Sequence, residues 1–166
     1  MSTLLDELQA DSALAHQHQS SMLGNPFSAV AVTLYRLGMR VHRAGWLRSA
    51  SMFQGTIQLL TGADIDMGAW IGPGLYFHHT VGVVVGGGVV AESNLVLYGG
   101  VVLGLREKSD RGVGFPKIGN NVEIFAKASA IGPIMIGDNA KIGAHALVLD
   151  DVAPNAVVKA PRPAKH

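Results

Sequence analysis

The stretches DIDMGAWIGPGLYFHHTVGVVVGGGVVAESNLVLYGGV (residues 64–101) and IGNNVEIFAKASAIGPIMIGDNAKIGAHALVLDDV (residues 118–152) share a repeat of six residues. In both stretches an apolar residue, usually branched or bulky, returns at every sixth position. A helix repeats every 3.6 residues and a strand every two, so neither element alone gives this pattern. The positions are Ile65, Ile71, Phe77, Val83, Val89, Leu95 and Val101, then Ile118, Ile124, Ala130, Ile136, Ile142 and Val148.

A repeat of six predicts a parallel β-helix, because that fold turns a corner after each short strand. The large apolar residue enters a triangular interior, small residues let the chain bend, and stacked coils bury a continuous apolar column. We therefore predict a mainly β protein with a β-helix over residues 63–166. Residues 1–62 lack the repeat, and we predict a small α-helical region there.

Composition is typical of one compact domain. The chain has 166 residues, of which 48% are hydrophobic and 15% charged, and this balance argues against disorder. A formal net charge of +1 gives no reason to expect nucleic acid, and the absence of cysteine excludes disulfides and thiolate sites. The acidic N-terminus and the lack of a long apolar run predict a cytoplasmic protein.

The segment from Phe27 has helical spacing and carries a row of arginines, Arg36, Arg40 and Arg43. One interpretation is a solvated face or an ion-paired subunit contact. The other is a cationic surface that meets anionic lipid or a lipid-linked sugar phosphate at the inner face of the membrane.

The motifs TGADIDMGAWIGPGLYFHHTVGVVVGGG, LYGGVVLG, FPKIGNNVEI and IGDNAKIGAHALVLDDVAPN bring the chain close to a known family. It resembles the serine acetyltransferase branch of the left-handed β-helix, or hexapeptide-repeat, acyltransferases. That branch also contains exopolysaccharide O-acetyltransferases of the colanic acid type, whose short helical region is similar to the one here. The resemblance implies a left-handed coil, a homotrimer and acetyl-CoA as co-substrate, without a metal.

The resemblance also indicates which residues are catalytic. His79 aligns with the family's catalytic histidine, and Asp64 aligns with the carboxylate that orients it. A neutral imidazole suits removal of the acceptor hydroxyl proton as the oxygen attacks a thioester. Asp64 lies 15 residues before His79, so with coils of about 18 residues it belongs to the preceding turn.

Metal binding is the alternative for the adjacent histidines, His78 and His79, since carbonic anhydrases on this fold use histidines as zinc ligands. The sequence shows no clear third ligand near them, so we predict no metal. His16 and His18 alternate in a polar stretch, where solvation is the simpler interpretation.

The repeat is interrupted by a charged segment, predicted to be a loop protruding over residues 104–117. The family's serine enzymes place an arginine and a histidine before the proline that closes this loop, where this chain has Gly114 and Phe115. His78 stands where they have an aspartate. We therefore expect His78 and Phe115 to bind a larger neutral acceptor, a sugar or lipid-linked saccharide.

Acetyl-CoA contacts are implied by the resemblance, mostly through the backbone of small residues. Two basic residues near the C-terminus, Lys159 and Arg162, are expected to meet its phosphates. The remaining implied contacts are Gly104, Leu105, Ala126 and Ala144.

Together these features predict an acetyl-CoA-dependent O-acetyltransferase for an exopolysaccharide precursor that acts by direct transfer. The alternatives are a serine or other small-molecule acetyltransferase, and a catalytically silent scaffold or zinc protein. The substituted residues Gly114 and Phe115 count against serine, and the intact pair Asp64 and His79 counts against silence.

Overall fold

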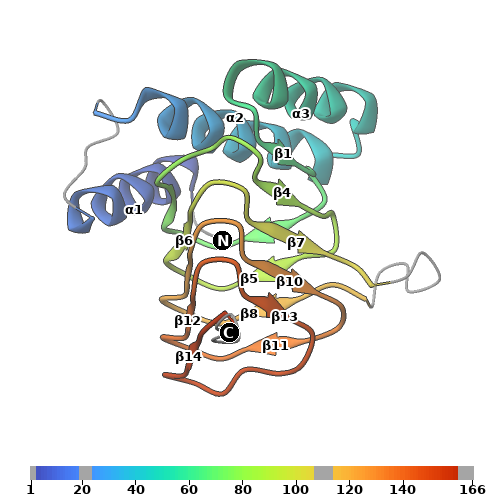
Figure 1. The fold of residues 1–166 in the computed structure, drawn as a ribbon. Helices are drawn as coiled ribbons and strands as arrows, with labels where there is room; N and C mark the ends of the chain where they lie inside the picture. The colour runs from blue at the N-terminus through green and yellow to red at the C-terminus, as the bar shows by residue number, and fades with distance from the viewer. Residues whose placement is uncertain (1–2, 19–23, 107–113, 161–166) are drawn as a thin grey trace.

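The computed structural model describes residues 3–18, 24–106 and 114–160, and in it three helices lie at one end of a column of short strands (Figure 1). The helices are α1 (Leu4–Gln17), α2 (Pro26–Arg43) and α3 (Leu47–Thr61). The strands are β1 (Asp64–Ile65), β2 (Trp70–Ile71), β3 (Leu75–Phe77), β4 (Val84–Val85), β5 (Val90–Ala91), β6 (Leu95–Leu97), β7 (Val102–Gly104), β8 (Lys117–Ile118), β9 (Glu123–Ile124), β10 (Ser129–Ile131), β11 (Met135–Ile136), β12 (Lys141–Ile142), β13 (Leu147–Val148) and β14 (Val157–Val158).

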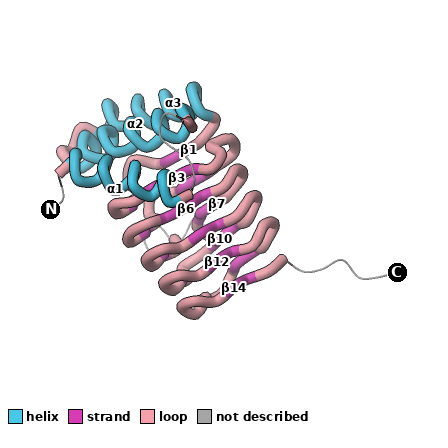
Figure 2. Tube along the Cα trace, turned by 90° about the vertical axis from the view of Figure 1, so that its left-hand side faces the viewer, coloured by secondary structure: helices cyan, strands magenta, loops and turns pink. Residues whose placement is uncertain are grey.

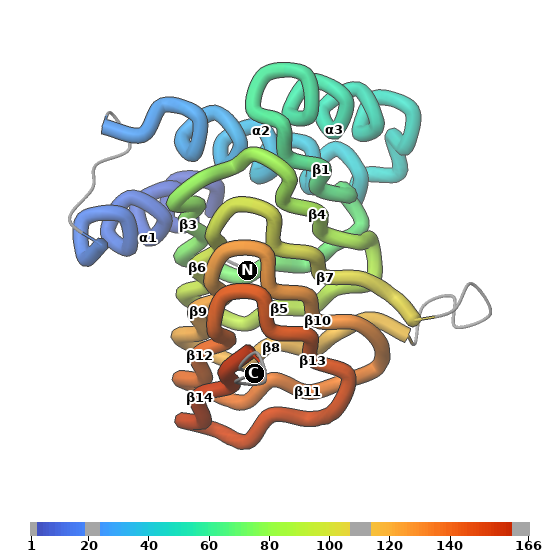
Figure 3. The backbone as a smooth tube through the Cα atoms, viewed as in Figure 1, coloured from blue at the N-terminus to red at the C-terminus, as the bar shows by residue number. Residues whose placement is uncertain are grey.

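The strands form three parallel sheets that run down the column, as the successive coils in Figures 2 and 3 show. Sheet A has the order β1-β4-β7-β10-β13, sheet B has β2-β5-β8-β11, and sheet C has β3-β6-β9-β12-β14. Strands adjacent in a sheet come from successive coils. This arrangement confirms the predicted hexapeptide-repeat β-helix with a helical N-terminal region.

Buried apolar side chains fill the coils, but the repeat shifts by two residues after Phe77. Phe77 pairs with Leu97, and Val85 pairs with Leu103. Eight residues therefore separate Phe77 from Val85, whereas six separate their partners. The predicted six-residue frame is therefore wrong in its middle part. The residues that stack on the first coil lie two positions after the predicted ones, which are Val83, Val89, Leu95 and Val101. Both sets are buried, so apolar spacing alone could not distinguish them.

Local sequence signals explain the ends of the helices. Thr3 and Asp6 form a reciprocal capping box at the start of α1, with distances of 2.8 and 3.1 Å. Asn25 caps α2, and Pro26 opens it. After α3 the chain turns through Gly62, whose φ of 72° is in the left-handed region.

Helices α2 and α3 cross closely at Gly38. A β-carbon at this position would overlap the side chains of Phe53 and Met67, so only glycine fits between α2, α3 and the first coil. This contact holds the helical layer on the open end of the solenoid.

Tyr35 and Arg36 of α2 supply the hydrogen bonds that a coil above β2 would otherwise make. Tyr35 Oη accepts from the Ile71 amide (3.1 Å) and donates to the Ala69 carbonyl (2.9 Å). Arg36 donates to the carbonyls of Ile71 (2.6 Å) and Gly72 (2.8 Å). Burial raises the pKa of Tyr35 to about 12, so its hydroxyl stays protonated at neutral pH.

Asp11 of α1 completes this cap above sheet C. Its carboxylate accepts from the amides of Gly74 (3.0 Å) and Leu75 (2.7 Å), and also from Arg36. Burial alone would lower the pKa of the Arg36 guanidinium, but the hydrogen bond and charge of Asp11 outweigh burial and raise it. The cap therefore contains a compensated pair of buried charges.

The interpretation of the arginine row as a membrane-facing surface is wrong. Arg36 is fully buried, and Arg40 is ion-paired with Glu7 at 3.0 Å, so only Arg43 of the three is exposed. The row serves mainly to join helices to the solenoid. Across the described ranges, no helix combines the length and hydropathy needed to cross a membrane.

An asparagine ladder runs down the corner between sheets B and C. The side-chain amide of Asn94 donates to Asn121 (2.8 Å), that of Asn121 to Asn139 (3.2 Å), and that of Asn139 to Asn155 (3.1 Å). All four have φ between 55° and 62°, which asparagine tolerates better than most residues. The ladder fixes these tight corners in register.

Candidate active site

His79 lies on the corner between sheets C and A that contains the two extra residues. The hydroxyl of Thr80 donates to the Thr61 carbonyl (2.7 Å), and the Gly82 amide donates to the Gly62 carbonyl (2.9 Å). These bonds tie the corner to the end of α3. The His79 side chain itself is exposed.

Asp64 begins β1 at the same corner, one coil above. Its amide donates to the Val83 carbonyl (2.8 Å), and its Oδ1 accepts from Gln54 Nε2 of α3 (2.7 Å). The structure therefore places Asp64 on the coil that precedes the His79 corner, and the role of the two residues as a catalytic pair stays a prediction. Among the described residues there is no hydrogen bond between them, and such bonds often tighten only when substrate is bound.

Small residues lie beneath His79 at the same corner of the following coils. A β-carbon on Gly99 would stand 3.2 Å from that of His79. The amide of Lys127, the residue after Ala126, donates to the Gly99 carbonyl (2.9 Å). The amide of His145, the residue after Ala144, donates to the Ala126 carbonyl (3.0 Å). We call His79, Gly99, Ala126 and Ala144 the His79 column. It offers backbone without bulky side chains directly below the histidine.

An aromatic stack runs beside this column. The His78 ring stacks on Tyr98 with centroids 4.2 Å apart, and Tyr98 stacks on Phe125 at 4.8 Å. His18 and Tyr76 meet the His78 ring edge-on at 5.4 and 5.0 Å. His78 is thus held rigidly between the end of α1 and the second coil.

Burial lowers the pKa of His78, and the nearby His18 and His79 lower it further, whereas Glu123 acts in the opposite direction. Its Nε2 atom is buried and has no hydrogen-bond partner in the described structure. A neutral imidazole keeps one donor and one acceptor nitrogen. Burial therefore favours the neutral form of His78, which leaves Nε2 uncharged.

Both histidines line one cavity of about 520 Å³, between the end of α1, the start of α2 and the His79 corner. Asn25 fixes this wall, because its Nδ2 donates to the carbonyls of Phe77 (2.9 Å) and His78 (3.1 Å). The lining residues are His18, Gly24, Asn25, Pro26, Phe27, Tyr76, His78 and His79.

Phe115 does not join this cavity in the single chain. Its ring covers Gly86 and Gly88, where added β-carbons would overlap it. Gly114, the other substituted position, is buried beside it. The idea that a sugar packs on Phe115 next to His78 therefore has no support in the geometry of one chain.

The residues expected to contact acetyl-CoA separate into two groups. Ala126 and Ala144 belong to the His79 column, whereas Gly104 ends β7 and Leu105 follows it, across sheet A from that column. Lys159 is exposed, and Arg162 lies outside the described residues. One chain alone does not join the two groups.

Possible metal ligands do not cluster in the part of the chain that the structure describes, where no three His, Asp or Glu side chains converge. His16 is exposed, and the His18 ring stacks near Tyr76 with centroids 6.0 Å apart.

Sequence reasoning missed Gln54 and Gly99. No helical pattern indicated that Gln54 would bond to Asp64. The two extra residues after Phe77 and the interruption after Leu103 hid the alignment of Gly99 with Ala126, and only strand pairing reveals it.

Comparison with known proteins agrees with this architecture. A sequence model described as bacterial transferase hexapeptide (six repeats) matches residues 115–150. The Helicobacter pylori serine acetyltransferase is 37% identical over 122 residues, which cover 74% of this chain and 71% of that protein. The Neisseria gonorrhoeae serine acetyltransferase superposes with a TM-score of 0.88 and 32% identity, covering 93% of this chain. A second structure of it, in complex with serine, gives the same score with 98% covered.

These relatives correct the predicted acceptor. They are serine acetyltransferases, and none of these findings supports an exopolysaccharide branch or a saccharide acceptor. The prediction depended on the substituted residues His78, Gly114 and Phe115, of which Phe115 packs on glycines instead of lining the cavity.

The chain spans 62% of the length of the first Neisseria structure, so part of that relative has no counterpart here. Identity, coverage and the repeated coil nevertheless agree along most of the chain. The chain belongs to the hexapeptide-repeat acyltransferase family, and the relatives named above are serine acetyltransferases.

Proposed function

We propose that this chain is a serine O-acetyltransferase that uses acetyl-CoA as its co-substrate. The observation that carries the proposal is the position of His79, which borders a cavity of about 520 Å³ and stands above a column of small residues. The serine acetyltransferase relatives support the choice of serine. The cavity would hold the amino acid, and the backbone of the column would bind the pantetheine arm.

In the proposed reaction, the imidazole of His79 removes the proton from the serine hydroxyl while the oxygen attacks the thioester carbon. The tetrahedral intermediate collapses by breaking the carbon–sulfur bond, and the imidazolium returns the proton to the departing thiolate. Asp64 would hold the imidazole and stabilise its charged form. Gln54 would in turn hold Asp64, to which it already donates at 2.7 Å. The products are O-acetylserine and free coenzyme A.

Two groups have chemistry that suits the charges of serine: His78, which lines the cavity, and Lys127, which lies two coils below the His79 corner. His78 is kept neutral by burial, so it retains an acceptor nitrogen for an ammonium group. Lys127 is exposed at the corner beside Gly100 and can attract a carboxylate. Together they would take the place of the arginine and the aspartate that the family's serine enzymes have where this chain has Gly114 and His78.

A homotrimer is part of the proposal. The outward positions of sheet A include Val84 and Leu147, which are 38% and 61% exposed in the single chain. Exposed apolar side chains of this kind are typical of a subunit contact. Packing of this sheet against a neighbour would bring Gly104 and Leu105 of one subunit toward the His79 column of another. Analytical ultracentrifugation should find a trimer, which Leu147→Glu should weaken.

The test of function is release of free thiol from acetyl-CoA in the presence of different acceptors. L-serine should give the highest rate among L-serine, D-serine, L-threonine, L-homoserine and glycerol, and His79→Ala should remove the acceptor-dependent part. If L-serine adds nothing to the rate measured without acceptor, the proposed substrate is wrong.

A further inference from the structure

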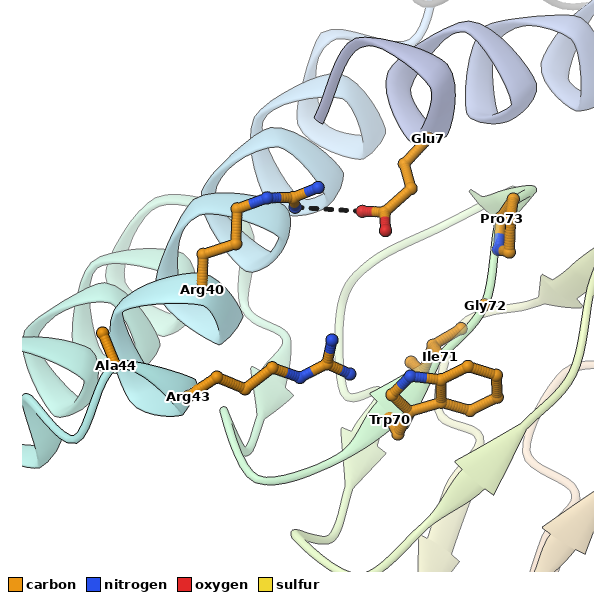
Figure 4. A pocket seen from close by; sticks show the side chains of 8 residues that line it. All are labelled: Glu7, Arg40, Arg43, Ala44, Trp70, Ile71, Gly72 and Pro73. Carbon is orange, nitrogen blue, oxygen red and sulfur yellow. Dashed lines mark hydrogen bonds and ion pairs between the residues drawn. The ribbon is translucent and has the colours of Figure 1, made fainter. Parts of the chain in front are cut away.

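A second cavity, of about 460 Å³, lies where the helices meet the first coil (Figure 4). We call it the junction cavity. It shares no lining residue with the cavity at His79. Its volume is within the range typical of small-molecule sites. The lining residues are Glu7, Arg40, Arg43, Ala44, Trp70, Ile71, Gly72 and Pro73.

Among the described residues, the charges around this cavity leave one cation without a counter-charge. Asp11 compensates Arg36 through two hydrogen bonds, and Glu7 binds Arg40 at 3.0 Å. Arg43 takes part in no ion pair within the described residues. The lining therefore carries a net charge of about +1, contributed by Arg43.

Trp70 forms the opposite wall. It lies on β2, the edge strand of sheet B, and its side chain is 37% exposed. Figure 4 shows the guanidinium of Arg43 extending from α2 toward the indole of Trp70. A flat apolar surface and a planar cation thus face the same space.

We propose that the junction cavity binds a small organic anion with a flat apolar body. Its carboxylate or phosphate group would pair with Arg43 and with those donors of Arg40 that neither Glu7 nor the Arg36 carbonyl uses, since a guanidinium binds both groups through two parallel hydrogen bonds. Its ring would pack on Trp70. This site is independent of the proposed acetyl transfer, because neither His79 nor its column contributes to it.

Fluorescence can test the site directly. The chain has two tryptophans, so Trp46→Phe leaves Trp70 as the only indole. This variant is titrated with benzoate and with phenyl phosphate, which distinguish a carboxylate site from a phosphate site. Acetate and inorganic phosphate test the anion alone, and benzyl alcohol tests the ring alone. At least one aromatic anion should give saturable quenching at a concentration about tenfold below that needed with the simple ions.

Arg43→Gln in the same background should weaken binding about tenfold or more, through loss of the charge-assisted pair. Arg48→Gln, which removes an exposed arginine of α3, is the matched control and should change binding less than twofold. Absence of saturable quenching overturns the proposal. Equal binding by the two arginine variants overturns it as well. If Arg43→Gln then also lowers the melting temperature, the role of Arg43 is to stabilise the C-terminal end of α2.

Discussion

Arg36 and Asp11 form a bidentate ion pair, with nitrogen–oxygen distances of 3.0 and 2.8 Å, in which neither side chain is exposed. The pair also satisfies backbone groups of the first coil, so it connects α1, α2 and the solenoid in one network. Breaking one partner of such a pair leaves an uncompensated buried charge.

We predict that Asp11→Ala destabilises the fold by about 3–5 kcal/mol, because the Arg36 guanidinium and two amides lose their partner. For a chain of this size the melting temperature should fall by about 10 °C. Glu123→Ala is the control, since it breaks a 3.0 Å pair with the half-exposed Lys141 and should lower stability by about 1 kcal/mol or less. Equal melting temperatures for the two variants would contradict the assigned role of Asp11.

We predict that His79→Ala lowers the rate of acetyl transfer about 100- to 10,000-fold, because the hydroxyl loses its base. Its exposed side chain contributes little packing, so the melting temperature should change little. Asp64→Asn and Gln54→Ala should also lower kcat, the second by less, without raising KM for acetyl-CoA. Activity of His79→Ala within threefold of the unsubstituted chain would place the base elsewhere.

The repeat could be predicted from sequence because a buried column imposes it along the whole chain. Its phase could not, because Val83 and Val85 are both buried and both apolar. The prediction that Arg36 lies on an exposed face was wrong for a related reason. Helical spacing shows that the arginines share one face of α2, but it does not show whether that face contacts water or the backbone of a distant coil.

The low pKa of His78 gives a pH dependence of known sign. Folding disfavours its charged form, so the unfolded chain binds more protons as the pH falls below about 6.5, and stability decreases there. Burial lowers the pKa of His78 most, His18 and His79 lower it further, and Glu123 raises it, while the rings of Tyr76 and Tyr98 pack against the imidazole. We predict that His78→Phe, which keeps the aromatic stack, loses less melting temperature between pH 7.5 and 5.5 than the unsubstituted chain.

The control for this pH dependence is His16→Phe, which replaces an exposed histidine of α1. Identical slopes for all three proteins would show that His78 is not the group responsible.

The asparagine ladder predicts a difference between alanine and glycine at one position. Asn121 has φ of 55° and bonds to the asparagines above and below it. Asn121→Ala loses these bonds and leaves a β-carbon in the left-handed region without the polar side chain that lets asparagine tolerate it, so it should destabilise by about 2–3 kcal/mol. Asn121→Gly loses only the bonds and should destabilise by about 1 kcal/mol less. Equal free energies of unfolding from urea denaturation would contradict this account.

Phe115 shows why part of the site escaped prediction. Alignment placed it before the proline that closes the loop, but no sequence signal showed that Gly86 and Gly88 form a flat surface for its ring. The structure makes this packing specific, since a β-carbon on either glycine would overlap the ring.

We therefore predict an energetic coupling between Gly88 and Phe115. Gly88→Ala alone should destabilise by about 1–3 kcal/mol, because the new methyl group displaces the ring. In a Phe115→Ala background the same change should be neutral or slightly stabilising, since φ at Gly88 lies outside the left-handed region and alanine restricts the unfolded chain. Urea unfolding of the four proteins gives the coupling, expected at about 1–3 kcal/mol. Additive effects would show that the ring leaves this surface in solution, where it would be free to reach a bound acceptor.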